Sequence, residues 1–273
     1  AETMSAFYYF WEQSGGDGSH FVAITDPGSN LEKLAKESNF RKVFFADSTV
    51  GGRYSALTAF GLVPAALQGI DASKALDSAA SMMNDVDDAL FLGAVMGAAA
   101  LNGRDKLMLI TDSAFNPFGA WAEQLIAEST GKEGKGIVPV DDETLLAPEK
   151  YGDDRYFIYL RGDGAHDDFV SQLKEANQPV LVIQTGDPYS LFKEFYRWEY
   201  ATAIACHILG VNAFDQPNVE DAKTQARAQI DAYSQTGVLD EGKAAWEGEN
   251  GKIYTNADLA EASLKSAFDA FLA

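Results

Sequence analysis

The chain has 273 residues, a net charge of −20 and a single cysteine, and these numbers exclude several classes of protein. A hydrophobic share of 47% can fill a core, which excludes wholesale disorder. The 41 acidic residues against 21 basic ones disfavour nucleic acid or an anionic membrane surface as a partner. The longest apolar stretches, 90–101 and 201–211, are shorter than the ~20 residues of a membrane span. The lone Cys206 cannot form an internal disulfide, so we expect an acidic, soluble, cytoplasmic protein of one or two domains.

Short apolar runs alternate with longer amphipathic segments along the first hundred residues. The aromatic segment Ser5–Gln13 is helix-like, and strands are expected at His20–Thr25 and Val43–Ala46. Ser29 or Asn30 can cap the next helix, which runs to about residue 38. Further helices are expected at 58–68, 72–83 and 91–101. The last of these is so apolar that we expect it to be buried on most sides.

A second series of alternating elements begins with the buried strand Lys106–Thr111. Further strands are expected at 136–139, 156–160 and 179–183. Helices are expected at 118–127, 167–176, 190–209 and 219–236. Strands that alternate with helices indicate an α/β fold with a largely parallel sheet. The two series therefore indicate two α/β units, the first of them incomplete.

Paired glycines, Gly51 and Gly52, stand directly before Arg53. Glycines let a backbone turn tightly and approach a ligand, and their N–H groups can face an anion. An arginine at this place can stabilise a phosphate or a developing oxyanion. The plainer alternative is a tight turn with a surface arginine.

The segment 123–136, EQLIAESTGKEGKG, joins an amphipathic helix to a polar, glycine-rich loop. Glu128 falls near the end of that helix, where the helix dipole disfavours an anion. A general base benefits from such tuning toward the working pH. The alternative is a solvated glutamate before a helix-capping loop.

Two further places hold candidate polar residues. The segment 214–223 is a turn that enters a helix, with Gln216 before a proline and Lys223 one to two turns further on; ordinary capping and a surface lysine are the alternative. His166 sits on a loop after a strand and before a helix, which is where ligands bind in α/β sheets. His207 is interpreted as a packed core residue of an apolar helix.

Taken together and in this order, these segments resemble the glucose-6-phosphate isomerase family. The resemblance spans nearly the whole chain, and EQLIAESTGKEGKG is highly specific for the family. Its main blocks are 50–66, 123–136 and 214–223. The isomerase half of bifunctional transaldolase/glucose-6-phosphate isomerases is most similar in the segments 21–28 (FVAITDPG), 54–66 and 212–223.

The resemblance implies a fold and a reaction. The family fold has two sugar-isomerase domains, each a three-layer α/β/α arrangement around a parallel sheet. We expect residues 1–75 to be the remainder of the first domain and 76–273 to be the second domain with C-terminal helices. The implied reaction of glycolysis and gluconeogenesis interconverts glucose 6-phosphate and fructose 6-phosphate through a cis-enediol(ate), with no metal or organic cofactor.

The resemblance also implies a role for each site residue. Glu128 is the expected base, which carries a proton between C2 and C1 of the sugar. Arg53, with Gly52 beside it, is expected to stabilise the negative charge that develops on the enediolate. Lys223 and Gln216 are expected to contact the ring oxygen or the phosphate, with Lys223 assisting ring opening.

The sequence departs from the family pattern at two places. A neighbouring subunit of the family donates a histidine from a Gly-Thr-Asn-Gly-Gln-His motif, which the segment 163–166 only approximates, so His166 is a candidate for that role. The Ser/Thr-rich phosphate loop of the family has no counterpart in the chain, and Glu2 and Thr3 would border it. We therefore hypothesise a C-terminal fragment of a longer isomerase, which forms a homodimer or associates with the missing N-terminal part.

Two alternatives to this catalytic interpretation stay open. One is a different sugar-phosphate isomerase or a non-catalytic sugar-phosphate-binding regulator. A regulator would need the sugar pocket but not the base, so the carboxylate of Glu128 argues against a regulator. The other is a structural or interaction fragment of a larger bifunctional enzyme, whose acidic surface complements a basic partner.

Overall fold

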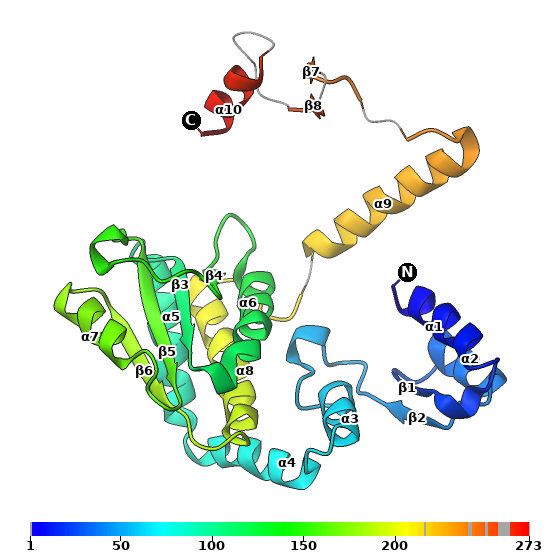
Figure 1. Ribbon diagram of the computed structural model, residues 1–273, viewed down its shortest axis with the longest axis horizontal. Helices are drawn as coiled ribbons and strands as arrows, with labels where there is room; N and C mark the ends of the chain where they lie inside the picture. Colours follow the sequence, from blue (N-terminus) through cyan, green and yellow to red (C-terminus); the bar gives the residue numbers. More distant parts are fainter. Residues whose placement is uncertain (1, 216, 240–241, 249–250, 256–262, 273) are drawn as a thin grey trace. The chain divides into compact units, whose positions relative to one another are not determined.

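The computed structural model divides the chain into two compact units, residues 1–215 and 216–273 (Figure 1). The structure describes all residues except 1, 216, 240–241, 249–250, 256–262 and 273. The expected boundary near residue 75 divides two sheets that both lie in the first unit. The assignment of 1–75 and 76–273 to two sugar-isomerase domains stays a prediction.

The first part of unit one is a small parallel β-sheet with its helices. Strands β1 and β2 pair in parallel, with Val22 opposite Lys42. Ser29 caps α2 by accepting the backbone N–H of Glu32, so the expected cap is confirmed. The elements are α1 (Glu2–Gln13), β1 (Val22–Thr25), α2 (Asn30–Glu37), β2 (Lys42–Phe45), α3 (Ala59–Leu67), α4 (Ala72–Ser81) and α5 (Val86–Leu101). Short 3-10 helices occur at Gly18–His20, Gly52–Tyr54, Met82–Asn84, Ser113–Phe115 and Pro148–Lys150.

A four-stranded parallel sheet organises the rest of unit one. Its strand order is β4-β3-β5-β6, and the central strands β3 and β5 pair over six residues. Connections leave β3 and β5 toward opposite edges, which makes the gap between their carboxyl ends a topological switch point. The elements are β3 (Lys106–Thr111), α6 (Asn116–Thr130), β4 (Val138–Val140), β5 (Arg155–Arg161), α7 (Asp167–Glu175), β6 (Val180–Gln184) and α8 (Ser190–Leu209).

Two hydrophobic clusters cover the two faces of this sheet. Successive side chains of a strand point to opposite faces, and β5 follows that rule: Ile158 packs into one cluster and Phe157 into the other. The first cluster includes residues of α5, α6 and α8, and the second includes residues of α7. Helices therefore lie on both faces of the parallel sheet, as Figure 1 shows.

Helices α5 and α8 pack so closely that two glycines are needed between them. A Cβ atom on Gly93 would lie 2.5 Å from the carbonyl oxygen of Ala201, and one on Gly97 would lie 2.8 Å from Ile208. The expectation that the apolar α5 is buried on most sides is wrong. Phe91 is 59% exposed and Leu101 is 62% exposed, because only the face toward α8 and the sheet is covered.

The second unit contains α9 (Pro217–Thr236), the antiparallel strands β7 (Trp246–Gly248) and β8 (Gly251–Ile253), and α10 (Leu264–Leu272). Within the described part of the chain, no helix combines the length and the apolar character needed to cross a bilayer.

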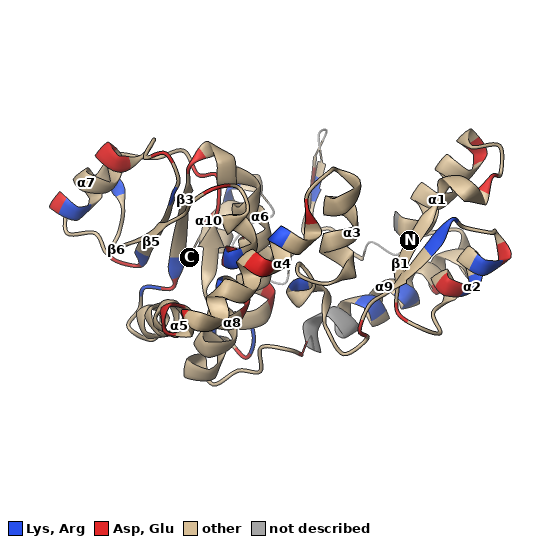
Figure 2. Ribbon diagram, turned by 90° about the horizontal axis from the view of Figure 1, so that it is seen from below, with Lys and Arg blue, Asp and Glu red and all other residues tan. Residues whose placement is uncertain are grey.

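Acidic residues occupy the beginnings of several helices. Asp87 and Asp88 lie in the first turn of α5, and Asp167 and Asp168 lie in the first turn of α7. Figure 2 shows lysine and arginine interspersed with the acidic positions along the ribbon. An acid at a helix N-terminus is stabilised by the helix dipole, so part of the net negative charge supports the fold.

Candidate active site

Arg53 is buried in the short 3-10 helix Gly52–Tyr54, with a side chain that is 3% exposed. Its Nε donates to Oγ of Ser129 (3.0 Å), and its Nη2 donates to the carbonyl oxygens of Ala213 (2.8 Å) and Asp215 (3.3 Å). Among the described residues, the buried Nη1 atom has no hydrogen-bond partner. The guanidinium is therefore fixed at two nitrogens and leaves the third for a ligand.

Glu128 faces that third nitrogen from the last turn of α6. Its Oε2 lies 3.5 Å from Nη1 of Arg53, which makes an ion pair but no hydrogen bond. Its Oε1 accepts from Nε2 of Gln124 (3.1 Å), one turn earlier on the same helix. The Glu128 side chain is 39% exposed. The carboxylate is thus held at one oxygen, and the other stands beside a buried cation where a small molecule can reach it.

A tight turn follows α6 and carries two lysines. Glu133 and Gly134 have φ values of 56° and 72°, and the turn closes with a bridge between Lys132 and Lys135. The buried Lys132 donates to Oδ1 of Asp215 (2.6 Å), to the Asp215 carbonyl oxygen (2.8 Å) and to the carbonyl oxygen of Asn212. This turn therefore ties the end of α6 to the loop whose carbonyls hold Arg53.

Buried groups that resist ionisation surround the Arg53 guanidinium. Burial raises the pKa of Tyr54 to about 12, and its hydroxyl donates to Oγ of Ser129 (3.3 Å). Burial raises the pKa of Cys206 to about 11, and its thiol donates to the carbonyl oxygen of Ser129 (3.3 Å). Burial also raises the pKa of Glu199 to about 8. Tyr54 and Cys206, the two neighbours that share Ser129 with this site, therefore both stay neutral near neutral pH.

The structure brings together some of the residues predicted from the sequence. Arg53 and Glu128 meet at one place, and Gly52 directly precedes Arg53 in the same 3-10 helix. Thr3 is exposed in the first turn of α1, and no hydrogen bond or ion pair described in the structure joins it to this group. Lys223 is exposed on α9, in the second unit. Two predictions, Gln216 and the side chain of Glu2, lie outside the described residues.

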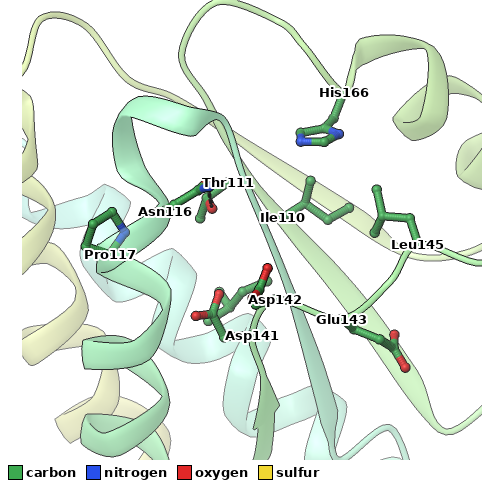
Figure 3. Close-up of a pocket in the computed structure, with 10 residues that line it drawn as sticks. Ile110, Thr111, Asn116, Pro117, Asp141, Asp142, Glu143, Leu145 and His166 are labelled. Carbon is green, nitrogen blue, oxygen red and sulfur yellow. Dashed lines mark hydrogen bonds between the residues drawn. The ribbon is translucent and has the colours of Figure 1, made fainter.

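His166 lies elsewhere in the first unit, at the carboxyl end of the four-stranded sheet. It precedes α7 and, as Figure 3 shows, lines a pocket across from Asp141 and Asp142. The pocket has a volume of about 480 Å³, and Thr111 and Asn116 also line it. His166 follows a strand and precedes a helix, as expected. No contact among the described residues joins it to Arg53 or Glu128.

A buried carboxylate supports the loop before His166. Burial opposes ionisation of Asp112, yet hydrogen bonds from the backbone N–H of Gly164 and the hydroxyl of Tyr159 hold its pKa below the usual range. The distances are 2.7 Å from Gly164 N and 2.8 Å from Tyr159 Oη.

The interpretation of His207 as a core residue is wrong, because it is exposed on α8.

Three residues that contact the site received no role from the sequence: Gln124, Ser129 and Lys132. All lie in the block 123–136, so the signal available was a hydroxyl and a lysine close to the candidate base. Gln124 holds Glu128 one turn further along the same helix, whereas the partners of Ser129 and Lys132 lie far away in the chain, so only the folded structure shows those two contacts.

Comparisons with known proteins find glucose-6-phosphate isomerases among the relatives of this chain. No protein-family model matches the chain. A probable glucose-6-phosphate isomerase of Methanococcus maripaludis is 31% identical over 247 residues, which cover 75% of this chain and 56% of that protein. A glucose-6-phosphate isomerase of Leptospira interrogans is 29% identical over 279 residues, which cover 81% of this chain and 62% of that protein. The chain spans little more than half the length of most of the curated relatives it matches.

Solved structures establish the fold. The hypothetical protein TT0462 of Thermus thermophilus superposes with a TM-score of 0.70 at 22% identity, over 84% of this chain and 68% of that one. A glucose-6-phosphate isomerase of Chlamydia trachomatis superposes with a TM-score of 0.64 at 20% identity, over 85% of this chain and 56% of that one. The expected fold class, α/β/α layers around parallel sheets of the sugar-isomerase type, is confirmed.

Proposed function

We propose that this chain carries the base and the enediolate-stabilising arginine of an isomerase that interconverts glucose 6-phosphate and fructose 6-phosphate. The observation that supports this most is the pairing of Oε2 of Glu128 with Nη1 of Arg53, 3.5 Å apart, where Nη1 is buried and has no hydrogen-bond partner in the part of the chain that the structure describes. An unbonded guanidinium nitrogen beside an accessible carboxylate suits a substrate that gains negative charge as it loses a proton. The names of the relatives support the same reaction.

The two side chains divide the chemistry between them. Oε2 of Glu128 takes the proton from C2 of the open-chain aldose, and the C–H electron pair forms the C1–C2 double bond while the carbonyl electrons move to O1. Nη1 of Arg53 donates to the oxygen on which that charge develops. The O2 hydroxyl proton passes to O1, which moves the negative charge to O2. Collapse of O2 to the C2 carbonyl then drives the C1–C2 double-bond electrons to take the proton back from Glu128 at C1, which gives the ketose and restores the carboxylate. Loss of a preorganised donor of this kind costs about 3–4 kcal/mol of transition-state stabilisation.

The remaining functions of the site are assigned by resemblance. Lys223 and Gln216 would contact the ring oxygen or phosphate, and His166 of a second copy would assist ring opening in a homodimer. Glu2 and Thr3 would border the phosphate site. We propose further that the phosphate loop belongs to a longer form of the protein, in which a transaldolase part can precede the isomerase.

The test compares Glu128→Gln with wild type in the full-length gene product. We expect kcat to fall by about 10²–10⁴-fold with a small change in KM, because a general base acts in the transition state. Loss of solvent-deuterium exchange at C2 of glucose 6-phosphate would accompany the fall. The matched control is Glu123→Gln, an exposed glutamate on the same helix, which should keep wild-type turnover.

Unchanged turnover in Glu128→Gln would instead support a non-catalytic sugar-phosphate-binding or structural role. The chain should also be assayed alone beside the full-length product. Comparable turnover would contradict the proposal that the phosphate loop lies outside this chain.

A further inference from the structure

We propose that Lys132 is a positioning residue, which holds the loop 212–215 so that Arg53 points its free nitrogen at Glu128. The inference rests on the proposed function, in which Nη1 of Arg53 stabilises the enediolate. The hydrogen bonds described for the Lys132 ammonium all go to this loop, so the lysine acts on Arg53 through the loop.

The first link is between Lys132 and the loop. The Lys132 side chain is 5% exposed, and its ammonium reaches the carbonyl oxygens of Asn212 and Asp215 as well as Oδ1 of Asp215. An ammonium has three N–H donors, so these three acceptors satisfy it. A buried charge with every donor used fixes its partners strongly, since any movement leaves a donor unpaired in a dry place.

The second link is between the loop and Arg53. The carbonyl oxygens of Ala213 and Asp215 accept from Nη2 of Arg53, and the Asp215 carbonyl is shared with Lys132. Ser129 holds Nε of the same guanidinium. Because a guanidinium is planar and rigid, fixing Nε and Nη2 determines where Nη1 lies. A displaced loop would therefore redirect Nη1 while leaving Arg53 folded and buried.

Lys135 provides a matched control from the same turn. Its ammonium donates to the carbonyl oxygen of Leu209 (2.9 Å), at the end of α8, and no described contact joins its side chain to the residues 212–215. Both lysines therefore connect the turn 131–136 to the end of α8 and the loop that follows it. Of the two lysines, Lys132 alone has a described hydrogen bond to a carbonyl that also holds Arg53, that of Asp215.

The experiment is a double-mutant cycle on turnover of glucose 6-phosphate by the full-length gene product. Lys132→Met should lower kcat by about 100-fold with a smaller change in KM, because misplacing a reacting group by an ångström costs that much. In an Arg53→Ala background, Lys132→Met should cost less than twofold more, since the lysine acts through the arginine. Lys135→Met should lower the melting temperature and keep kcat within twofold. Losses that multiply in the double variant would overturn the proposal.

A second readout does not depend on activity. The ¹⁵N–¹H resonance of Arg53 Nε, assigned by its loss in Arg53→Ala, should shift and exchange faster with solvent in Lys132→Met but not in Lys135→Met. An unchanged resonance would overturn the proposal even if turnover fell. If wild type does not isomerise glucose 6-phosphate, the proposed function fails and the resonance still decides the positioning role. If Lys132→Met does not fold, Asp215→Asn, which alters only the half-exposed partner, should give the same shift in smaller measure, and no shift would refute the link.

Discussion

The buried hydroxyl of Ser129 accepts a hydrogen bond from Nε of Arg53 at 3.0 Å, while its sequence neighbour Glu128 faces Nη1 of the same guanidinium at 3.5 Å. Both side chains come from the last turn of α6. One helix end therefore both orients the arginine and places the carboxylate opposite it. This arrangement couples the position of the acid to that of the cation, and the 212–215 loop supplies the second fixed point of the guanidinium.

Removing the Ser129 hydroxyl should damage turnover and stability together. Ser129→Ala leaves Nε of Arg53 unpaired in a buried place, which costs about 1–3 kcal/mol, and we expect kcat to fall roughly tenfold as the guanidinium loses a fixed point. Chemical denaturation and steady-state kinetics measure the two effects. Thr130→Val is the control, because it removes the adjacent buried hydroxyl, whose partners are Ile126 and Ile137. Equal kcat losses in both variants would contradict an orienting role for Ser129.

Arg53→Lys should be no conservative change. A lysine cannot reach Ser129, the 212–215 carbonyls and the substrate from one planar group, so we expect kcat/KM to fall by about 10²–10³-fold, as for a lost oxyanion donor. Steady-state kinetics with glucose 6-phosphate measure the fall. Lys33→Arg, an exchange between the same residue types at an exposed ion pair of α2, should leave kinetics unchanged. Full activity of Arg53→Lys would show that a point charge suffices.

Glu199 should make the protein less stable as the pH rises. Burial raises the pKa of Glu199 to about 8 from 4.5, and its Oε1 has no hydrogen-bond partner among the described residues. Because the folded state holds this proton more tightly than the unfolded state, its contribution is full below pH 4.5 and is lost as pH rises through about 8. With about 1.4 kcal/mol per unit of pKa, the loss is on the order of 5 kcal/mol.

The variant Glu199→Gln isolates that contribution. It cannot ionise, so its melting temperature relative to wild type should rise between pH 5 and pH 9. Glu194, whose pKa burial also raises, is present in both proteins and drops out of the difference. A melting-temperature difference that is constant with pH would contradict the assignment to Glu199.

The α5–α8 contact should not tolerate a methyl group. A Cβ atom on Gly93 would lie 2.5 Å from the Ala201 carbonyl oxygen and 2.7 Å from Cβ of Ile204. We expect Gly93→Ala to destabilise the fold by about 1–3 kcal/mol through overpacking, despite the better helix propensity of alanine. Thermal unfolding measures this. Gly186→Ala is the control, since its nearest neighbour lies 4.0 Å away, and an equal loss there would count against the packing explanation.

Parts of the fold could be predicted from local pattern alone. The strand Lys106–Thr111 has the predicted bounds, because its run of apolar residues is flanked by polar residues at both ends. The end of α6 differs: predicted at residue 127, it lies at Thr130. The hydroxyl of Thr130 donates to the Ile126 carbonyl one turn earlier and accepts from the N–H of Ile137, which lies beyond the turn that follows the helix. Glu128 consequently lies inside the helix rather than after it.

Burial of single residues was harder to predict than the elements themselves. His207 belongs to an apolar segment, yet the buried positions Ala201, Ala205 and Leu209 lie on one face of α8 and the histidine projects from another. The meeting of Arg53 with Glu128 was expected only through resemblance. The contacts of Lys132 could not be predicted at all, because their partners lie 80 and 83 residues away and nothing local signals them.

The hydrogen bonds of Arg53 span 76 residues to Ser129 and 160 residues to Ala213. Contacts between such distant segments form only after long loops have closed, at a cost in chain entropy. The site is therefore expected to assemble late in folding and to vanish with the global transition rather than by local fraying. A ligand that bridges Arg53 and Glu128 would then raise the melting temperature of the whole first unit, so thermal shift can screen sugar phosphates without measuring turnover.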